Sequence, residues 1–280
     1  MLETTLLYLW GGLGNQLFQY AAGLTVAEAT GSRLILLPAQ DNIHSTRDYR
    51  PGLMPAGRTL ESFGYDTPIT PDTMFWPSNP HQGWSPYAIR AQNMGNARNL
   101  LLRGYFQYLP AIESQVLEIR NDILTRFAEV RRGLATAYRV ENREALAFLH
   151  VRRGDYLGLQ DKGFHILGPE YYIPAIEAVE RRRTASLRWL IVSDDPAWLH
   201  EQSWLPHGAE VIEGLDEVAT LLLLSLCEGG AVLSNSTFNW WGAILSGSSN
   251  VAYPSRWIGE EEPELFPSNW IRIRATRAES

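Results

Sequence analysis

The fold of this chain is decided by the stretch ALAFLHVRRGD, residues 145–155. Its first seven residues are largely apolar and predict a strand, and charged residues follow directly after that strand. Further along the chain, helical and strand patterns alternate: helices are expected at 169–183, 215–227 and 237–245, and strands at 187–192, 231–233 and 250–253. This alternation predicts an α/β fold with a parallel sheet, whose ligands bind beyond the carboxyl ends of the strands.

The N-terminal half carries the same pattern less regularly. Residues 6–10 predict a strand, Gly11-Gly12-Leu13-Gly14 predicts a break, and apolar residues at helical spacing then predict a helix: Leu17, Tyr20, Ala21, Leu24 and Ala27. A second strand is expected at 33–37 and a helix at 111–139. Residues 38–109 are rich in proline, glycine and aromatic residues and show weak periodicity, so we expect long loops and short elements there. Long loops in a compact domain are often functional.

A boundary near residues 139–144 divides the chain into two lobes, 1–140 and 141–280. Each lobe is long enough to bury a core of its own. The sequence therefore predicts two Rossmann-like lobes that face each other across a central cleft.

Charge and cysteine content narrow the classes of function. The 280 residues carry 24 Lys and Arg against 31 Asp and Glu, a net charge of −7 with no long basic run, which argues against nucleic acid as a partner. The single cysteine, Cys227, permits no intrachain disulfide and is expected to be a buried, inert thiol. The first residues do not resemble a signal peptide, and no apolar run approaches the ~20 residues that cross a bilayer. We therefore expect a cytoplasmic protein, with peripheral membrane contact left open.

The polar residues after strand 145–151 are the first candidates for chemistry. Arginine presents a fork of donors that matches phosphate oxygens and stays charged at working pH. Arg152 and Arg153 point to opposite sides of an extended chain, so one of them is expected to face a given ligand. The alternative reading is a pair of surface arginines that form salt bridges with Asp155.

A second candidate follows strand 231–233. Ser234-Asn235-Ser236-Thr237 leads into the helix that begins at Thr237, and its hydroxyls can cap that helix or share its exposed N–H groups with an anion. Phe238 starts an apolar helical face that we expect to belong to the core.

Two further stretches lie where ligands are expected. Asp194 and Asp195 follow strand 187–192, where one carboxylate can accept from a nucleoside and the other can cap a helix starting at Pro196. Residues 11–16, GGLGNQ, lack the third glycine and the later acidic residue of a dinucleotide fingerprint. They suit a tight turn that brings backbone and the Asn15 amide close to a ligand.

Several motifs are missing from the sequence. It contains no phosphate-binding P-loop, no His-Glu-x-x-His and no set of cysteines for zinc. It also has no Asp-x-Asp at the end of a strand, the usual manganese-binding pair of metal-dependent nucleotide-sugar enzymes. No metal or other cofactor is therefore expected.

Taken together, these stretches resemble the bacterial α-1,2-fucosyltransferases of glycosyltransferase family 11 over nearly the whole chain. The resemblance rests on GGLGNQLFQY at 11–20, GYFQ at 104–107, HVRRGDY at 150–156, SDD at 193–195 with Trp198, Cys227, residues 234–243, and Tyr253-Pro254 with Trp257. The His-x-Arg-Arg-x-Asp element is shared with other fucosyltransferases and by itself indicates use of GDP-fucose. This chain has Asn239 where family members usually carry serine.

The resemblance implies a GT-B-like fold with the donor site in the C-terminal lobe, and an inverting transfer of L-fucose from GDP-fucose to the 2-hydroxyl of a galactose-containing glycan. It implies that Arg152 holds the diphosphate. The acceptor hydroxyl must lose its proton in the reaction, and we expect Asp155 or, second, Asp161 to be the base and Asn15 to orient the hydroxyl. The loops of 38–109 would form the acceptor wall. The implied donor-binding residues are Gly12, Gly14, Gln16, His150, Arg153, Asp194, Asn235, Ser236, Thr237 and Phe238.

Three alternatives remain open from the sequence. One is a fucosyltransferase of another linkage or acceptor. Another is a nicotinamide-dependent oxidoreductase, which the incomplete fingerprint at residues 11–16 disfavours. The third is a non-catalytic sugar-binding protein.

Overall fold

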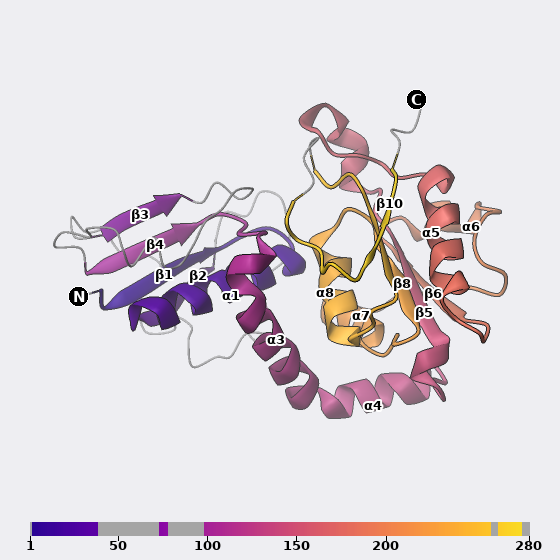
Figure 1. The fold of residues 1–280 in the computed structure, drawn as a ribbon, viewed down its shortest axis with the longest axis horizontal. Helices are drawn as coiled ribbons and strands as arrows, with labels where there is room; N and C mark the ends of the chain where they lie inside the picture. The colour runs from indigo at the N-terminus through magenta and orange to yellow at the C-terminus, as the bar shows by residue number, and fades with distance from the viewer. Residues whose placement is uncertain (1, 39–72, 78–97, 259–262, 276–280) are drawn as a thin grey trace. The chain divides into compact units, whose positions relative to one another are not determined.

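The computed structural model describes residues 2–38, 73–77, 98–258 and 263–275 (Figure 1). The chain forms two compact units. The N-terminal unit comprises Met1–Ile123 with Pro263–Leu265, and the C-terminal unit comprises Leu124–Glu262 with Phe266–Ser280. The roles assigned to the two lobes, and the boundary at 140, stay predictions.

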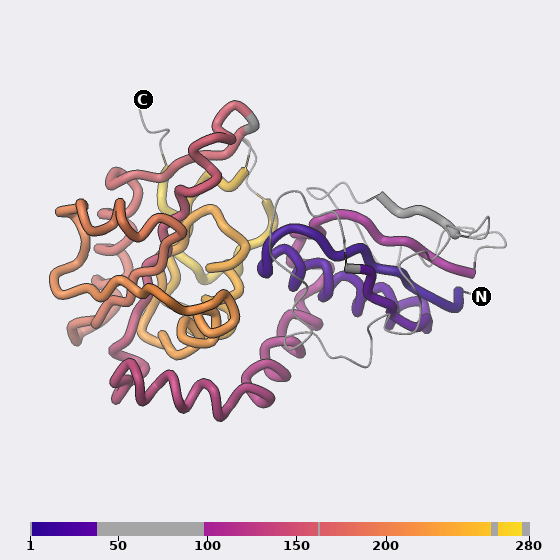
Figure 2. Tube along the Cα trace, turned by 180° about the vertical axis from the view of Figure 1, so that it is seen from behind, coloured from indigo at the N-terminus to yellow at the C-terminus, as the bar shows by residue number. Residues whose placement is uncertain are grey.

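The described part of the N-terminal unit is built on a four-stranded parallel sheet with the order β2-β1-β4-β3. Its strands are β1 (Thr4–Leu9), β2 (Arg33–Pro38), β3 (Thr73–Pro77) and β4 (Asn99–Arg103). Helix α1 (Leu13–Thr30) connects β1 to β2 and lies beside β1 (Figure 2), and α3 (Leu109–Arg126) follows β4. The strands β3 and β4 lie within residues 38–109, where the sequence predicts short elements among long loops but no bounds for them, because the periodicity there is weak.

Alternation along β1 decides which side of this sheet α1 covers. Thr5, Leu7 and Leu9 are almost fully buried. Leu7 lies against α1, where a β-carbon at Gly23 would come within 2.8 Å of the Leu7 side chain. Tyr8 and Trp10 therefore belong to the opposite face of the sheet, because successive side chains of a strand point to opposite sides.

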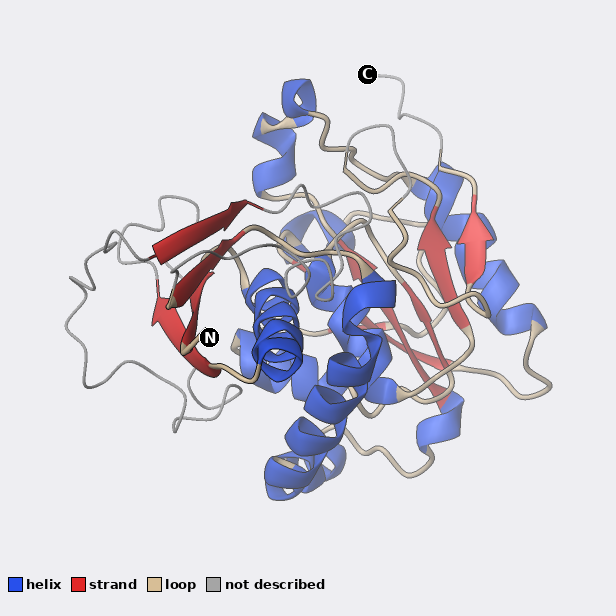
Figure 3. Ribbon diagram, turned by 60° about the vertical axis from the view of Figure 1, so that its left-hand side comes forward, coloured by secondary structure: helices blue, strands red, loops and turns tan. Residues whose placement is uncertain are grey.

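The C-terminal unit holds a six-stranded parallel sheet among its described residues, in the order β10-β9-β8-β5-β6-β7. Its strands are β5 (Leu146–Val151), β6 (Arg188–Ser193), β7 (Glu210–Val211), β8 (Gly230–Val232), β9 (Val251–Pro254) and β10 (Ile271–Ile273). The helices are α4 (Ala128–Ala137), α5 (Pro169–Arg181), α6 (Pro196–His200), α7 (Glu217–Leu224) and α8 (Thr237–Ser246). Helices lie on both faces of the sheet, with α5 and α6 on one side and α7 and α8 on the other (Figures 1 and 3).

The parallel α/β architecture confirms the predicted fold class, and the predicted strands of the C-terminal half agree with the observed ones within a residue or two. The helix predicted at 111–139 is instead two helices that break at Phe127, whose backbone leaves helical values at φ −103°, ψ 21°. The helix predicted at 215–227 is shorter, because the Asp216 side chain caps its first turn by accepting from the Ala219 N–H. The sequence does not predict the strands β7 and β10, which are only two and three residues long.

Cys227 is fully buried after α7, as its position behind a leucine run predicts. Its thiol lies 3.9 Å from the Leu223 carbonyl, and burial raises its pKa well above the ordinary value. Within the described ranges, none of the helices has both the length and the apolar character needed to span a membrane.

Candidate active site

The strand order of the C-terminal sheet reverses between β5 and β8. From β5 the chain continues to β6 and β7 on one side, whereas β8 leads to β9 and β10 on the other. In open parallel sheets, ligands bind at such a reversal, beyond the carboxyl ends of the strands. The segments that follow β5 and β8 are the two that carry the predicted donor-binding motifs.

His150, at the carboxyl end of β5, ties these two segments together. Its Nδ1 lies 2.8 Å from the Ser234 hydroxyl, and the Asn239 amide nitrogen lies 3.0 Å from the same Nδ1 and 2.8 Å from that hydroxyl. The three side chains are buried, and the Phe238 ring packs at 5.9 Å from the imidazole. The sequence predicts His150 but misses its partners, because Ser234 and Asn239 are more than 80 residues away in the chain.

Burial lowers the pKa of His150 to about 3; the Asp194 charge opposes this shift and the Arg152 charge adds to it. The imidazole is therefore neutral at working pH. An unfolded histidine titrates near 6.5, so the unfolded chain binds the proton more readily and folding is disfavoured as pH falls. The contribution of His150 to stability is complete above pH 6.5 and is lost between 6.5 and about 3.

We expect the free energy of unfolding of the wild type to fall more steeply with acid than that of His150→Asn. The difference between the two should approach about 1.4 kcal/mol per pH unit below pH 6.5, the value for one proton. Urea unfolding of both proteins at pH 7.5, 6.0 and 5.0 measures this difference. Parallel pH dependences would contradict it.

Arg152 lies between two carboxylates just beyond β5. Its Nη2 donates to Asp155 Oδ1 at 2.6 Å, and its Nη1 lies 3.0 Å from Asp194 Oδ2. The guanidinium also lies over the Tyr156 ring, 5.1 Å from the centroid. Its Nε is buried and has no hydrogen-bond partner among the described residues. The surface pairing with Asp155 that the sequence left open is therefore present, but it uses only part of the guanidinium.

Arg153 turns to a different set of partners, as the alternation of an extended chain predicts. Its Nε donates to Asp195 Oδ2 at 3.2 Å, and its guanidinium lies over the Trp198 ring at 4.2 Å. Asp195 also accepts from the Trp198 N–H and caps α6. The sequence predicts one carboxylate for the site and one for the cap, and the cap is confirmed for Asp195.

Asp194 occupies the space directly beside the backbone of residues 153 and 154. Its Oδ1 accepts from the Arg153 N–H at 2.9 Å. A β-carbon at Gly154 would lie 2.3 Å from Asp194 Oδ2, which is far below contact distance. The glycine is therefore what permits Asp194 to reach Arg152.

The segment after β8 leads into the N-terminus of α8. Ser236 is the N-cap, and its hydroxyl accepts from the Phe238 N–H at 3.4 Å, which is long for a hydrogen bond. Ser236 and Thr237 are both partly exposed. Asn235 is fully buried and donates to the carbonyls of His165 and Trp257, so in this structure it joins loops; its part in donor binding stays a prediction.

Tyr156 adds a contact between the same two segments that the sequence does not reveal. Its hydroxyl donates to the Asn235 carbonyl at 2.9 Å.

Of the two candidate bases, Asp155 is the one that reaches Arg152. Asp161 is exposed in the next 3-10 turn, Gln160–Lys162.

The predicted residues of the N-terminal unit lie at the start of α1. The chain bends at Gly11, whose φ is +78°, and Gly12 is the N-cap of the helix. Residues 13–16 form the first helical turn rather than a loop, so Gly14 is a buried helical residue. Asn15 accepts from the Gln107 amide at 3.2 Å, and Gln16 donates to the Gly11 carbonyl at 2.9 Å.

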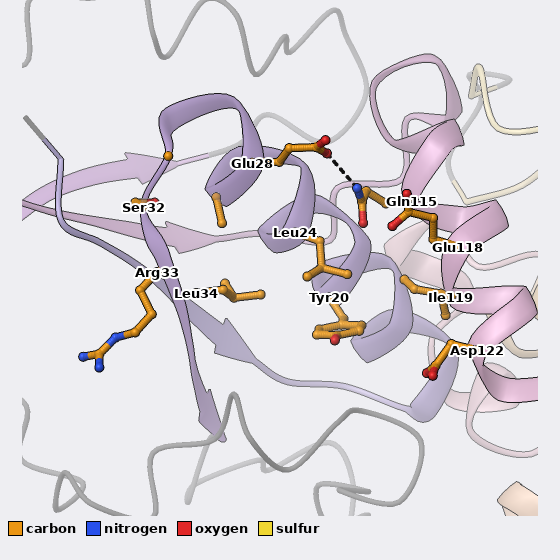
Figure 4. A pocket seen from close by; sticks show the side chains of 12 residues that line it. Tyr20, Leu24, Glu28, Ser32, Arg33, Leu34, Gln115, Glu118, Ile119 and Asp122 are labelled. Carbon is orange, nitrogen blue, oxygen red and sulfur yellow. Dashed lines mark hydrogen bonds between the residues drawn. The ribbon is translucent and has the colours of Figure 1, made fainter. Parts of the chain in front are cut away.

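A cavity of about 790 Å³ in the N-terminal unit lies elsewhere, between α1, the start of β2 and α3 (Figure 4). Glu28, Glu118 and Asp122 give it three carboxylates, and Glu28 accepts from Gln115. Its lining includes the amino end of β2, and its three carboxylates outnumber its one arginine, Arg33, so the cavity does not suit a nucleotide diphosphate. Among the described residues, no group of three His, Cys, Asp or Glu side chains could hold a metal ion.

The two parallel α/β units define the class of fold, which is GT-B-like. The solved fucosyltransferase NodZ from Bradyrhizobium is similar in fold, with a TM-score of 0.53 at 12% identity over 88% of this chain and 93% of that chain. At 12% identity, this similarity shows a shared fold and carries no conclusion about function.

The sequence comparisons place the chain more closely. The model of glycosyl transferase family 11 matches residues 3–274, and the chain belongs to this family. It is 25% identical to an α-1,2-colitosyltransferase of Escherichia coli over 295 residues, which cover 95% of this chain and 97% of the relative. It is also 25% identical to galactoside α-(1,2)-fucosyltransferase 1 of Leontocebus fuscicollis, over 97% of this chain and 75% of that protein. Membership of this family rules out the oxidoreductase alternative.

Proposed function

We propose that the protein transfers L-fucose from GDP-β-L-fucose to the 2-hydroxyl of a terminal galactose, with inversion and without a metal ion. The names of the relatives support an α-1,2 linkage and a galactoside acceptor. The observation that carries the proposal is the convergence of Arg152, His150 and the N-terminus of α8 at the β5/β8 reversal.

This convergence suits the departure of a nucleotide diphosphate. When the bond between fucose C1 and the β-phosphate oxygen breaks, the electron pair stays on GDP and the sugar gains positive charge. A fixed guanidinium and helix N–H groups stabilise that negative charge more in the transition state than in the ground state. The buried Arg152 Nε, which has no partner among the described residues, supports a ligand oxygen as its acceptor. Ser236 and Thr237 would add donors, and His150, Arg153, Asp194 and Phe238 would border the nucleotide.

The acceptor hydroxyl must lose its proton as its oxygen bonds to C1 from the opposite face. We propose Asp155 as the group that takes this proton. In this structure its Oδ1 accepts from Arg152, and a phosphate oxygen that replaces it as the acceptor of this guanidinium would leave Oδ1 available. Asp161 is the second candidate, and Asn15 would orient the hydroxyl.

The proposal is tested by incubating the protein with GDP-fucose and lactose in excess EDTA. We expect a fucosylated trisaccharide whose NMR spectrum shows an α-1,2 linkage. Product that forms only when manganese is added would overturn the metal-free mechanism. Another linkage would overturn the acceptor assignment, and transfer only from the corresponding activated colitose would overturn the donor sugar.

A further inference from the structure

In the sheet of the N-terminal unit, β1 and β4 are neighbouring parallel strands, so their carboxyl ends lie side by side. From β1 the chain passes through α1 to β2 on one side, and β4 lies on the other side of β1. Ligands of parallel α/β sheets bind beyond the carboxyl ends of the strands, so the residues that follow β1 and β4 are candidates for ligand contact.

Aromatic side chains gather beyond the carboxyl ends of β1 and β4. Trp10 follows β1 directly and Tyr105 lies two residues after β4, and their rings stack at 4.7 Å with an interplanar angle of 8°. The Arg103 guanidinium lies 5.8 Å from the Trp10 ring and 5.7 Å from the Tyr8 ring. All three rings are partly exposed, and Tyr8 belongs to the face of the sheet away from Leu7 and Leu9.

The backbone around this pair is held in place at some cost. Phe106, between Tyr105 and Gln107, is buried at φ +53°, in the left-handed region that favours glycine. Such conformations persist only where the surroundings enforce them, and they concentrate at functional sites. The Gln19 side chain holds the backbone of Trp10, because it accepts from the Trp10 N–H at 3.0 Å and donates to the Trp10 carbonyl at 3.2 Å.

Amide groups lie beside the aromatic pair. Gln107 donates to Asn15 at 3.2 Å, and the bend at Gly11 permits the approach of Asn15, since a β-carbon at Gly11 would lie 2.9 Å from its amide nitrogen. The Gln16 Oε1 atom is buried without a hydrogen-bond partner within the described part of the chain. Aromatic faces that pack against C–H groups, with amides that bind hydroxyls, make a surface suited to a neutral pyranose ring.

We propose that Trp10, Tyr105, Asn15 and Gln107 form the subsite for the acceptor sugar, with the Tyr105 ring packing against the galactose. That the sugar is the acceptor rests on the proposed function. The subsite lies within the N-terminal unit, whereas Arg152, Ser236 and Thr237, the proposed contacts with the diphosphate, belong to the C-terminal unit.

The test separates the two substrates. Tyr105→Ala should raise the KM for lactose about tenfold at saturating GDP-fucose and change kcat less, while the Kd for GDP measured by calorimetry stays within about twofold. Tyr105→Phe should keep the wild-type KM, because the ring remains. Tyr138→Ala, which removes a partly exposed ring at the end of α4, is the matched control and should change neither constant.

A wild-type KM in Tyr105→Ala, or an equal loss of GDP affinity, would overturn the subsite. If the chain transfers no sugar to lactose, saturation-transfer NMR with methyl β-galactoside still tests the surface without turnover. Loss of the signal in Tyr105→Ala but not in Tyr138→Ala would support the subsite even though the proposed function had failed. An unchanged signal, or no signal from the wild type, would overturn it.

Discussion

Arg152→Ala is expected to lower kcat with GDP-fucose by at least ~10²–10³, equivalent to about 3–4 kcal/mol of barrier. The proposed reaction places negative charge on the departing diphosphate, and the Arg152 guanidinium is the fixed charge nearest the end of β5. Its side chain is only 16% exposed and is held by Asp155 and Asp194, so it is already in place before the charge develops. Single-turnover measurements at saturating donor isolate this loss from a change in binding.

A control substitution at another arginine tests whether the loss of kcat is specific to Arg152. Arg181→Ala removes an exposed arginine on α5 that pairs with Glu177, and it should leave kcat unchanged. Arg152→Lys keeps the charge but not the fork and should fall between the wild type and Arg152→Ala. Far-UV circular dichroism checks that each variant is folded. Wild-type kcat in a folded Arg152→Ala would remove this residue from the mechanism.

Gly154→Ala is expected to lower kcat about 10- to 100-fold although it adds one methyl group. The new β-carbon would stand 2.3 Å from Asp194 Oδ2, so the carboxylate must move and give up its contacts with Arg152 and the Arg153 N–H. A displacement of about 1 Å in such a constellation can cost about 10²-fold in rate. The overpacking itself should cost about 1–3 kcal/mol of stability. Steady-state kinetics and thermal unfolding measure the two effects.

Gly158→Ala provides the control within the same loop. No atom lies within 4 Å of a β-carbon built at Gly158, which is the last residue of the 3-10 turn that follows Gly154. The substitution should change neither rate nor melting temperature appreciably. If both alanine variants behave alike, the contact between residue 154 and Asp194 is not what the site depends on.

The sequence predicts the sheet of the C-terminal unit well because its strands are continuous apolar runs. Residues 146–151 are all buried. A strand that is buried on both faces is a continuous apolar run, which can be identified from the sequence without knowledge of the neighbouring strands. The break at Phe127 was not predicted, since the apolar spacing of 111–139 continues across it. A helix boundary of this kind depends on packing rather than on a capping residue.

The sequence predicts which segments contribute to the candidate site, but it does not predict the contacts between residues of different segments. Asp195 could be recognised as a cap because a proline follows it. The hydrogen bonds among His150, Ser234 and Asn239 could not, because they depend on the register between β5 and β8. The stacking of Trp10 on Tyr105 likewise joins residues 95 positions apart, across strands that have no sequence signal of pairing.

The sole cysteine of the chain makes the protein convenient for labelling. Cys227 is fully buried and burial raises the pKa of its thiol, so maleimides should not react with it in the folded state. A second cysteine introduced at an exposed position such as Leu117 would then carry a dye at one known place. Ligand-induced changes in fluorescence could be assigned to that place without first removing the native sulfur.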